Sequence, residues 1–423
     1  MLEEIQKRPF ARPLFLWITG ILLQVFSPLQ TVSWFLLLIV FGVVIFSFCF
    51  IKRNSDVSYQ YRWVWGVLIS CLFIFFAIQS TYIAEKQMSD PPSSGWLREK
   101  AKQTQADMIS KLDGLQVSDD TKAVLAAITV NYKKTMTRET RSRFSATGVA
   151  HLLSVSGFHV GIVCAFLSLL FSAFPKRPLF HWSKYILTIC LLWTFAFIAG
   201  LSNPAVRAAF MLTVYLTGQV IQHRPERYNT LAAAAFCMLV VHPLSLFDIG
   251  FQLSFTAVFF ILYLQPRFYR LIELRNPIFK TLWGTLTVTV AAQIGTVFLS
   301  CFYFGQSSTV FLFTNLFLSL IATMLVPLTL IWMILPATIS GIGVLQWVVE
   351  ILSKGMMDVV NRFSQIPWAA FTLRFDLTTM LFAYGILGLL LCYLRSKRSW
   401  MLFTALLMIL FLLCKSIIAS EIF

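Results

Sequence analysis

The chain has 423 residues, of which 58% are hydrophobic and only 12% are charged, and its mean hydropathy is +0.77. This balance excludes a soluble globular protein, because one core could not hide so much apolar surface from water. The formal net charge of +16 lies in short clusters. Since cytoplasmic loops of membrane proteins are rich in Lys and Arg, we expect part of this charge to orient the chain rather than to bind a substrate.

Long apolar runs predict the fold class, an all-α polytopic integral membrane helical bundle with about 11 to 13 membrane passages. Each run approaches the roughly 20 residues that cross about 30 Å of hydrocarbon. Successive passages return to basic loops, which places the N-terminus in the cytoplasm. Apart from the run at 309–340, the expected passages are 14–26, 31–51, 64–83, 149–172, 185–201, 204–221, 229–246, 249–265, 281–303, 378–394 and 400–418.

Three parts follow from this arrangement. Residues 1–83 are expected to form N-terminal transmembrane helices, and residues 148–423 to form a channel domain. The polar segment 84–147 lies outside the cytoplasm in this topology. It contains the breaker DPPSSG and a polar helical pattern without alternating strands, so it predicts an extracytoplasmic loop with one helix.

Two segments near the C-terminal end have unusual patterns. The run 309–340 is too long for one passage, and Pro327 near its middle removes a helical hydrogen bond, which predicts a hairpin of two half-helices or two short spans. Residues 345–367 carry a charge at every fourth position from Glu350 to Arg362, with apolar side chains on the other face. This pattern predicts an amphipathic helix in the membrane interface.

The stretch HLLSVSGFHVGIV at 151–163 places two histidines inside an apolar run. An ionisable side chain at membrane depth costs at least about 2.5 kcal/mol on insertion scales, so it normally faces the bundle interior and serves a path or a partner. On one helix, His151 and His159 would lie about 80° apart and about 12 Å along the axis, too far for one metal ion. No third ligand is evident, so we expect neither a metal site nor a cofactor.

The same stretch has three other interpretations. Ser156 and His159, three residues apart, could be the nucleophile and base of an intramembrane serine hydrolase. The interpretation we prefer is conductive: Ser154, Ser156 and Gly157 permit close helix approach or a helix break, and the histidines line a wet interior. The third places the histidines in a packed core, where they are hydrogen-bonded.

Arg207 lies one turn inside a predicted helix start in GLSNPAVRAAF, where Asn203 can cap the helix and Pro204 suits its first turn. A helix N-terminus with a fixed guanidinium group is a site for anions. The alternative is an ion pair with a carboxylate such as Asp248, because a buried charge nearly always has a partner. Asp248 is itself predicted to cap the helix that follows it. These roles are compatible.

Three amides fall within later apolar segments: Gln252, Gln293 and Asn315. Amides in such segments either join helices through hydrogen bonds or line a pore. Both uses satisfy the polar group, and the sequence does not choose between them.

These motifs together resemble the ComEC-type DNA-internalisation proteins. HLLSVSGFHVGIV, with the preceding TG, is similar to the family's TSHLLAISGLHVGL. GLSNPAVRAAFM resembles LSPSAVRAALM, and HPLSLFDIGFQLSFTAV resembles DPLALFDVGFQLSFLAV. AAQIGTVFLSCFYFGQSSTVFLFTNLF resembles the family's Gln-rich span that leads to FGQ and a membrane Asn. In order and spacing the motifs cover about residues 140–330, a combination far more specific than any one of them.

The resemblance implies passage of single-stranded DNA through a channel in the inner (cytoplasmic) membrane during natural transformation, with no chemistry by the channel itself. An anionic strand needs a positive, water-filled route. The implied partners are single-stranded DNA, the lipid bilayer, a separate DNA receptor, a cytoplasmic helicase or translocase, and a separate nuclease. The DNA-path residues carried over from the motifs are His151, Ser156, His159, Arg207, Asp248, Gln252, Gln293 and Asn315, and Ser154, Gly157 and Asn203 complete the set.

Two departures from the family pattern concern extra domains. Relatives often carry an external oligonucleotide-binding barrel before the histidine motif, and the segment 84–147 is too short and too poor in strands to form one. They can also carry a C-terminal metallo-β-lactamase-like domain, whereas this sequence has no HxHxDH metal cluster. We therefore expect no nuclease activity from it.

Two alternative functions stay open. One is the intramembrane hydrolase built on Ser156 and a histidine. The other is a transporter of another anionic polymer or solute that uses the same bundle. No GxxxxGK[ST] nucleotide-binding loop is present, so a motor would be a separate protein.

Overall fold

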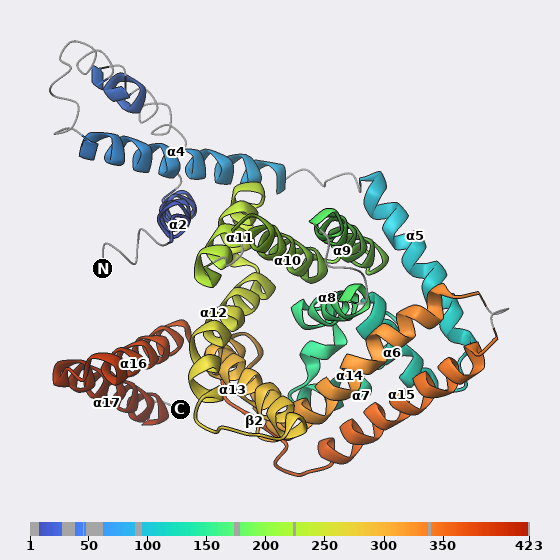
Figure 1. Cartoon of the computed structure of the whole chain (residues 1–423). Coiled ribbons are helices and arrows are strands. Elements are labelled where there is room, and N and C mark those ends of the chain that lie inside the picture. The colour runs from blue at the N-terminus through green and yellow to red at the C-terminus, as the bar shows by residue number, and fades with distance from the viewer. Residues whose placement is uncertain are drawn as a thin grey trace. The chain divides into compact units, whose positions relative to one another are not determined.

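The computed structural model describes residues 8–27, 39–44, 46–47, 62–88, 95–172, 178–222, 226–336 and 340–421 (Figure 1). The described chain is almost entirely helical, with one short antiparallel ladder between β1 and β2. Its elements are α2 (Ala11–Phe26), α4 (Arg62–Met88), α5 (Trp96–Lys111), η2 (Leu112–Gly114), α6 (Asp119–Val130), α7 (Arg138–Ala146), η3 (Ala150–Leu153), α8 (Gly157–Ser172), α9 (Pro178–Ile198), α10 (Asn203–Gln222), α11 (Arg227–Val241), η4 (Pro243–Phe247), α12 (Ile249–Tyr269), α13 (Pro277–Phe304), β1 (Gln306–Ser308), α14 (Phe311–Ile334), α15 (Ile342–Ser364), β2 (Ala370–Thr372), α16 (Leu377–Ser396) and α17 (Ser399–Glu421).

The apolar helices confirm an all-α, multi-pass membrane protein. Within the described residues, α4, α10, α12, α13, α14 and α16 are long and apolar enough to cross a membrane. Shorter apolar helices form at α2, α8, α9, α11 and α17. The expected passage at 31–51 lies largely outside the described residues. The number of passages stays a prediction.

The predicted break in the run 309–340 was wrong. Phe311–Ile334 forms one continuous helix, α14, with Pro327 inside it. A membrane helix tolerates the hydrogen bond lost at a proline where neighbouring helices cover that stretch. The side chains next to the proline, Leu325 and Val326, are 0% exposed, so packing holds the helix together across Pro327.

The segment 84–147 contains more helix than the predicted loop with one helix. Besides α5 it forms α6 and α7, and its described residues 95–147 contain no strand. The Ser118 side chain caps α6 by accepting a hydrogen bond from the Thr121 N–H, and Asn131 ends the helix in the left-handed region at φ 59°. Most of α6 is buried. Its short apolar run AVLAAITV was hidden between polar flanks, which is why the pattern predicted a loop.

The amphipathic pattern near the C-terminal end does form a helix, α15. Its charged side chains Lys354, Asp358 and Arg362 are exposed, while Val349 and Val360 on the opposite side are 0% exposed. The helix is therefore amphipathic as predicted. Its place in the membrane interface stays a prediction.

The chain divides into two compact units. Unit 1 comprises Met1–Met136, Leu152–Phe255 and Ile321–Lys354, and unit 2 comprises Thr137–His151, Thr256–Leu320 and Gly355–Phe423.

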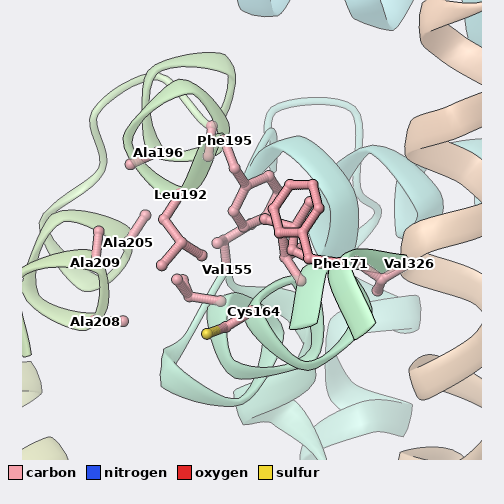
Figure 2. Close-up of a cluster of buried hydrophobic side chains, with 14 residues drawn as sticks. Val155, Cys164, Phe171, Leu192, Phe195, Ala196, Ala205, Ala208, Ala209 and Val326 are labelled. Carbon is pink, nitrogen blue, oxygen red and sulfur yellow. The ribbon is translucent and has the colours of Figure 1, made fainter. Parts of the chain in front are cut away.

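The main core of unit 1 joins α8, α9 and α10, and Val326 of α14 also contributes to it. Figure 2 shows these side chains gathered between the helices. The small side chains Ala205, Ala208 and Ala209 give α10 a surface that can approach its neighbours closely. In a membrane, where lipid tails are as apolar as leucine, such close packing is the main source of helix association.

A second cluster in unit 1 packs α2 and α4 against α11 and the start of α12 around Trp17. The indole N–H of Trp17 donates to the Leu239 carbonyl oxygen at 3.1 Å. At the crossing of α2 and α4, a Cβ atom on Gly20 would lie 2.6 Å from the Ala77 Cβ and 2.6 Å from the Ile74 carbonyl oxygen. Only glycine allows the two helices to approach this closely.

The core of unit 2 joins the second half of α12 with α13 and α16. The Phe260 ring lies where a Cβ on Gly295 would be, at 2.6 Å. The Tyr384 hydroxyl of α16 donates to the Gly295 carbonyl oxygen at 2.7 Å. Helices α16 and α17 form a hairpin (Figure 1), in which Lys415 Nζ lies 2.6 Å from an Asp376 carboxylate oxygen.

The crossing of α2 and α4 gives a stability test. We expect Gly20→Leu to lower the free energy of unfolding by about 1–3 kcal/mol, because the added side chain forces the helices apart. Gly66→Leu is the matched control, since a Cβ on Gly66 meets no atom within 4 Å, and it should leave stability nearly unchanged. Thermal unfolding of the purified chain in detergent measures both. Equal melting temperatures for the two variants would contradict the close packing.

Candidate functional site

The histidine motif begins α8 with a capping arrangement. The Ser156 carbonyl oxygen accepts the first helical hydrogen bond, from the Val160 N–H at 3.1 Å. In return the Ser156 backbone N–H donates to Nδ1 of His159 at 3.3 Å, and the Ser156 Oγ lies 3.1 Å from the same nitrogen. The bond to the Ser156 N–H is one half of a capping box, with histidine in place of the usual Glu or Gln three residues on. The buried His159 therefore has a structural role at the helix start.

Ser154 and Gly157 flank this cap. The Asn131 side-chain oxygen, at the end of α6, accepts from Ser154 Oγ at 3.1 Å and from the Val155 N–H at 3.1 Å. Ser154 thus ties the motif to α6 within unit 1. A Cβ on Gly157 would lie 4.0 Å from the Ala208 Cβ, an ordinary contact. Close helix approach is therefore not what requires glycine at this position.

Arg207 and Asp248 form an ion pair in unit 1, which is one of the two compatible roles predicted for Arg207 from the sequence. Arg207 Nη1 donates to Asp248 Oδ1 at 3.0 Å. The Arg207 side chain is only 9% exposed, whereas that of Asp248 is 43% exposed. The same Asp248 oxygen accepts from the Phe251 N–H at 2.7 Å and so caps α12, as predicted. One carboxylate oxygen thus neutralises a buried cation and starts a helix.

Asn203 does not cap α10, contrary to its predicted role. The Ser202 carbonyl oxygen accepts the first helical hydrogen bond, from the Val206 N–H at 2.9 Å, so Asn203 stands inside the first turn with its side chain exposed. Gly200 and Leu201 both have left-handed φ angles, of 71° and 47°. After this turn, helix α10 begins one residue earlier than the sequence pattern predicted.

The three amides differ in their surroundings. Asn315 Nδ2 donates to Thr289 Oγ1 at 2.8 Å and joins α14 to α13, which confirms a helix-joining role. Gln252 Nε2 donates to the Leu246 carbonyl oxygen at 3.0 Å, across the η4–α12 junction. Gln293 is half-buried on α13. The predicted pore-lining role of these amides stays a prediction.

His151 extends the Asn315 contact into a polar chain within unit 2. Its ring lies in polar contact with the Asn315 side chain and with the Gly148 backbone. Its side chain is exposed, unlike that of His159. Gly148 has a left-handed φ of 76°, and a Cβ there would lie 2.6 Å from the Phe311 Cβ. Glycine at this position therefore lets the chain approach the start of α14 and holds His151 beside it.

Most of the predicted DNA-path residues lie in three places, and Asn203, Gln252 and Gln293 are not part of them. In unit 2, His151 and Asn315 meet; in unit 1, Ser154, Ser156 and His159 surround the start of α8, and Arg207 pairs with Asp248. Gly157 stands at the α8 start without a close contact. Whether these places line one passage stays a prediction.

The sequence pattern missed two residues of the site. Asn131 follows the apolar run of α6, a position typical of a left-handed helix cap, so its role could have been found. Thr289 is one of several threonines on α13, and nothing in the sequence singled it out as the partner of Asn315.

This chain is similar to several known proteins. The model of the family described as Competence protein matches residues 128–398. ComE operon protein 3 of Bacillus subtilis is 26% identical over 292 residues, which cover 66% of this chain and 35% of that protein. Recombination protein 2 of Haemophilus influenzae is 26% identical over 141 residues, 32% of this chain and 18% of that protein.

An uncharacterized protein of Aquifex aeolicus is 30% identical over 130 residues, 31% of this chain and 30% of that protein. This chain spans 35% or less of the length of these three relatives. No solved structure matches it.

The unequal exposure of the ion pair gives an asymmetric prediction. Asp248→Ala should lower the free energy of unfolding by about 3–5 kcal/mol, because it leaves the buried Arg207 guanidinium without a counter-ion. Arg207→Met should cost clearly less, since the remaining carboxylate is exposed and still caps α12. The double variant should be more stable than Asp248→Ala alone. Thermal unfolding in detergent measures all three, and an Arg207→Met loss as large as that of Asp248→Ala would contradict the pairing.

Proposed function

Because this chain belongs to the Competence protein family, we propose that it conducts single-stranded DNA across the cytoplasmic membrane during natural transformation. The family match and the similarity to ComE operon protein 3 support this proposal. In it the N-terminus lies in the cytoplasm, as the distribution of basic loops predicts. The chain provides the passage for the strand and performs no chemistry of its own.

The observation that carries the proposal is the polar chain from His151 through Asn315 to Thr289. It crosses two helices of membrane-spanning length, α13 and α14, and ends in an exposed imidazole. Polar side chains at membrane depth are costly, and they normally mark a path for a polar substrate.

The proposal requires partner proteins for the steps that the helical bundle does not perform. In the proposal, a separate DNA receptor delivers the strand, a cytoplasmic helicase or translocase pulls it, and a separate nuclease removes its complement. The lipid bilayer surrounds the apolar helices.

The contact between Ser156 and His159 favours one alternative, an intramembrane serine hydrolase. Their separation of 3.1 Å is within reach of proton transfer. The same nitrogen, however, accepts the backbone N–H of Ser156, so helix capping already accounts for the contact.

The two interpretations of His159 make opposite predictions. Gln also accepts a hydrogen bond at this position of a capping box. We therefore expect His159→Gln to keep the melting temperature close to wild type, and His159→Leu to cost about 0.5–2 kcal/mol. DNA uptake should follow stability in both variants. Loss of uptake in a fully stable His159→Gln variant would instead favour a chemical role for the imidazole.

DNA uptake in a deletion strain tests the proposed function. The strain is complemented with wild type, His151→Leu or Asn315→Leu, and labelled DNA that becomes protected from external nuclease is measured. We expect both variants to reduce uptake at least about ten-fold, because they replace a polar path with an apolar one. Gln219→Ala is the control, since Gln219 is exposed and donates to the Tyr215 hydroxyl on its own helix.

Membrane levels of each variant are compared by immunoblot. Full uptake by both His151→Leu and Asn315→Leu would contradict the channel. Absence of uptake with wild type, together with transport of another polyanion, would favour the alternative of a different anionic substrate.

A further inference from the structure

Helix α7 presents two exposed arginines, Arg138 and Arg141. Arg138 and Arg141 are one turn apart, both are exposed, and neither makes an ion pair within the described residues. Thr137 caps the helix by accepting from the Thr140 N–H at 3.1 Å, and Phe144 anchors it with 0% exposure. Because the cap and the anchor are made by other residues, the two arginines are free to contact a ligand.

A polar cavity of about 610 Å³ lies between α7 and the end of α15, within unit 2. Ser142 and Arg143 line one side, and Asn361, Ser364 and Gln365 line the other. Arg143 Nη1 donates to the Asn361 side-chain oxygen at 2.9 Å, which joins the two walls.

The two charged side chains that line this cavity, those of Glu139 and Arg143, have opposite signs. Arg143 is also paired with Glu139, a further lining residue, so its charge is largely cancelled. Arg138 and Arg141 do not line the cavity, but they are exposed on the same helix as its first wall. The net positive charge of this surface therefore comes from these two arginines. The exposed Arg362 belongs to α15, whose end forms the second wall.

Exposed aromatic side chains follow directly after the cavity wall. Trp368 is 65% exposed and Phe371, on β2, is 44% exposed. The strand β2 pairs with β1, and Gln306 of β1 donates from its side-chain amide to the Ser145 hydroxyl of α7. Hydrogen bonds thus connect the aromatic strand to the basic helix within one unit.

We propose that this surface of α7, the end of α15 and β2 binds single-stranded nucleic acid, with Arg138 and Arg141 on phosphates and Trp368 and Phe371 stacked on bases. Basic groups beside exposed rings are the combination by which proteins hold single strands without sequence preference. The inference rests on the proposed function in one respect: the predicted topology puts α7 outside the cytoplasm, where the strand arrives.

An anionic lipid headgroup is the competing ligand, because exposed Trp also marks membrane interfaces. Two observations favour the nucleic acid. The cavity walls are formed mainly by hydroxyl, amide and charged side chains, which leaves no apolar groove for an acyl chain. The one aromatic ring of α7, that of Phe144, is buried and cannot insert into lipid.

Binding of a fluorescein-labelled oligothymidylate to the full chain tests the proposal. The chain is reconstituted in phosphatidylcholine nanodiscs, and fluorescence anisotropy gives the dissociation constant over a range of salt concentrations. The double variant Arg138→Ala/Arg141→Ala should bind more weakly, and its slope of log affinity against log salt should be smaller by about 1.4, since a single strand loses about 0.7 per phosphate contact. Trp368→Ala should weaken binding roughly 5- to 150-fold.

The controls are Arg98→Ala and Trp96→Ala on α5, which remove exposed side chains of the same types elsewhere. Both should bind as wild type does. Arg138→Lys/Arg141→Lys should keep most of the affinity and the salt slope, because lysine also binds phosphate as a point charge. This variant guards against a loss caused by misfolding.

Unchanged affinity in both test variants would overturn the proposal. So would a result in which the arginine pair affects retention of phosphatidylglycerol, measured by native mass spectrometry, and not oligonucleotide binding. If the cellular assay shows uptake while these variants bind and transport normally, the proposed binding surface is contradicted and the proposed channel function is not. If the wild-type chain binds the oligonucleotide at this surface but restores no uptake, the proposed channel function is contradicted and the proposed binding surface is not.

Discussion

The structure depends on one constraint: a polar group at membrane depth finds no water, so the chain itself must provide its hydrogen bonds. Buried threonines meet this demand within their own helices, as Thr81 does by donating to the Ala77 carbonyl oxygen at 2.7 Å. Charged groups need a partner from elsewhere. Asp248 supplies one for Arg207, and because its oxygen also caps α12, the pairing of two helices and the start of one rest on a single carboxylate.

The same constraint gives different roles to His151 and His159, the two histidines of the motif at 151–163. His159 is buried and its Nδ1 accepts the Ser156 N–H at the start of α8, so helix capping accounts for this ring nitrogen. His151 is exposed, and it continues a chain of polar contacts through Asn315. Two identical side chains eight residues apart thus have different physical roles. This difference is why the proposed path rests on His151 and not on its neighbour.

Periodicity predicted the helices well where one apolar run met one passage, as at α10 and α13. It failed at α14, because whether Pro327 breaks a helix depends on what packs against it, and that is a tertiary property. It also failed at α6, where a short apolar run between polar flanks is buried by contacts remote in sequence. Charge chemistry named Asp248 as a candidate partner of Arg207, because a buried charge nearly always has a partner. The partner of Asn315 could not be predicted, because hydroxyls are frequent on α13.

In unit 2, a short backbone segment joins the proposed binding surface to the proposed path. Four residues separate the end of α7 at Ala146 from His151, and two contacts hold them in place. The Thr314 hydroxyl donates to the Thr147 carbonyl oxygen at 2.7 Å, and Gly148 approaches the first residues of α14 too closely for any side chain. Helix α7 and the His151 ring are therefore held to the same end of α14. A strand bound by the arginines of α7 would be presented to the polar chain at a fixed distance, with no moving part between them.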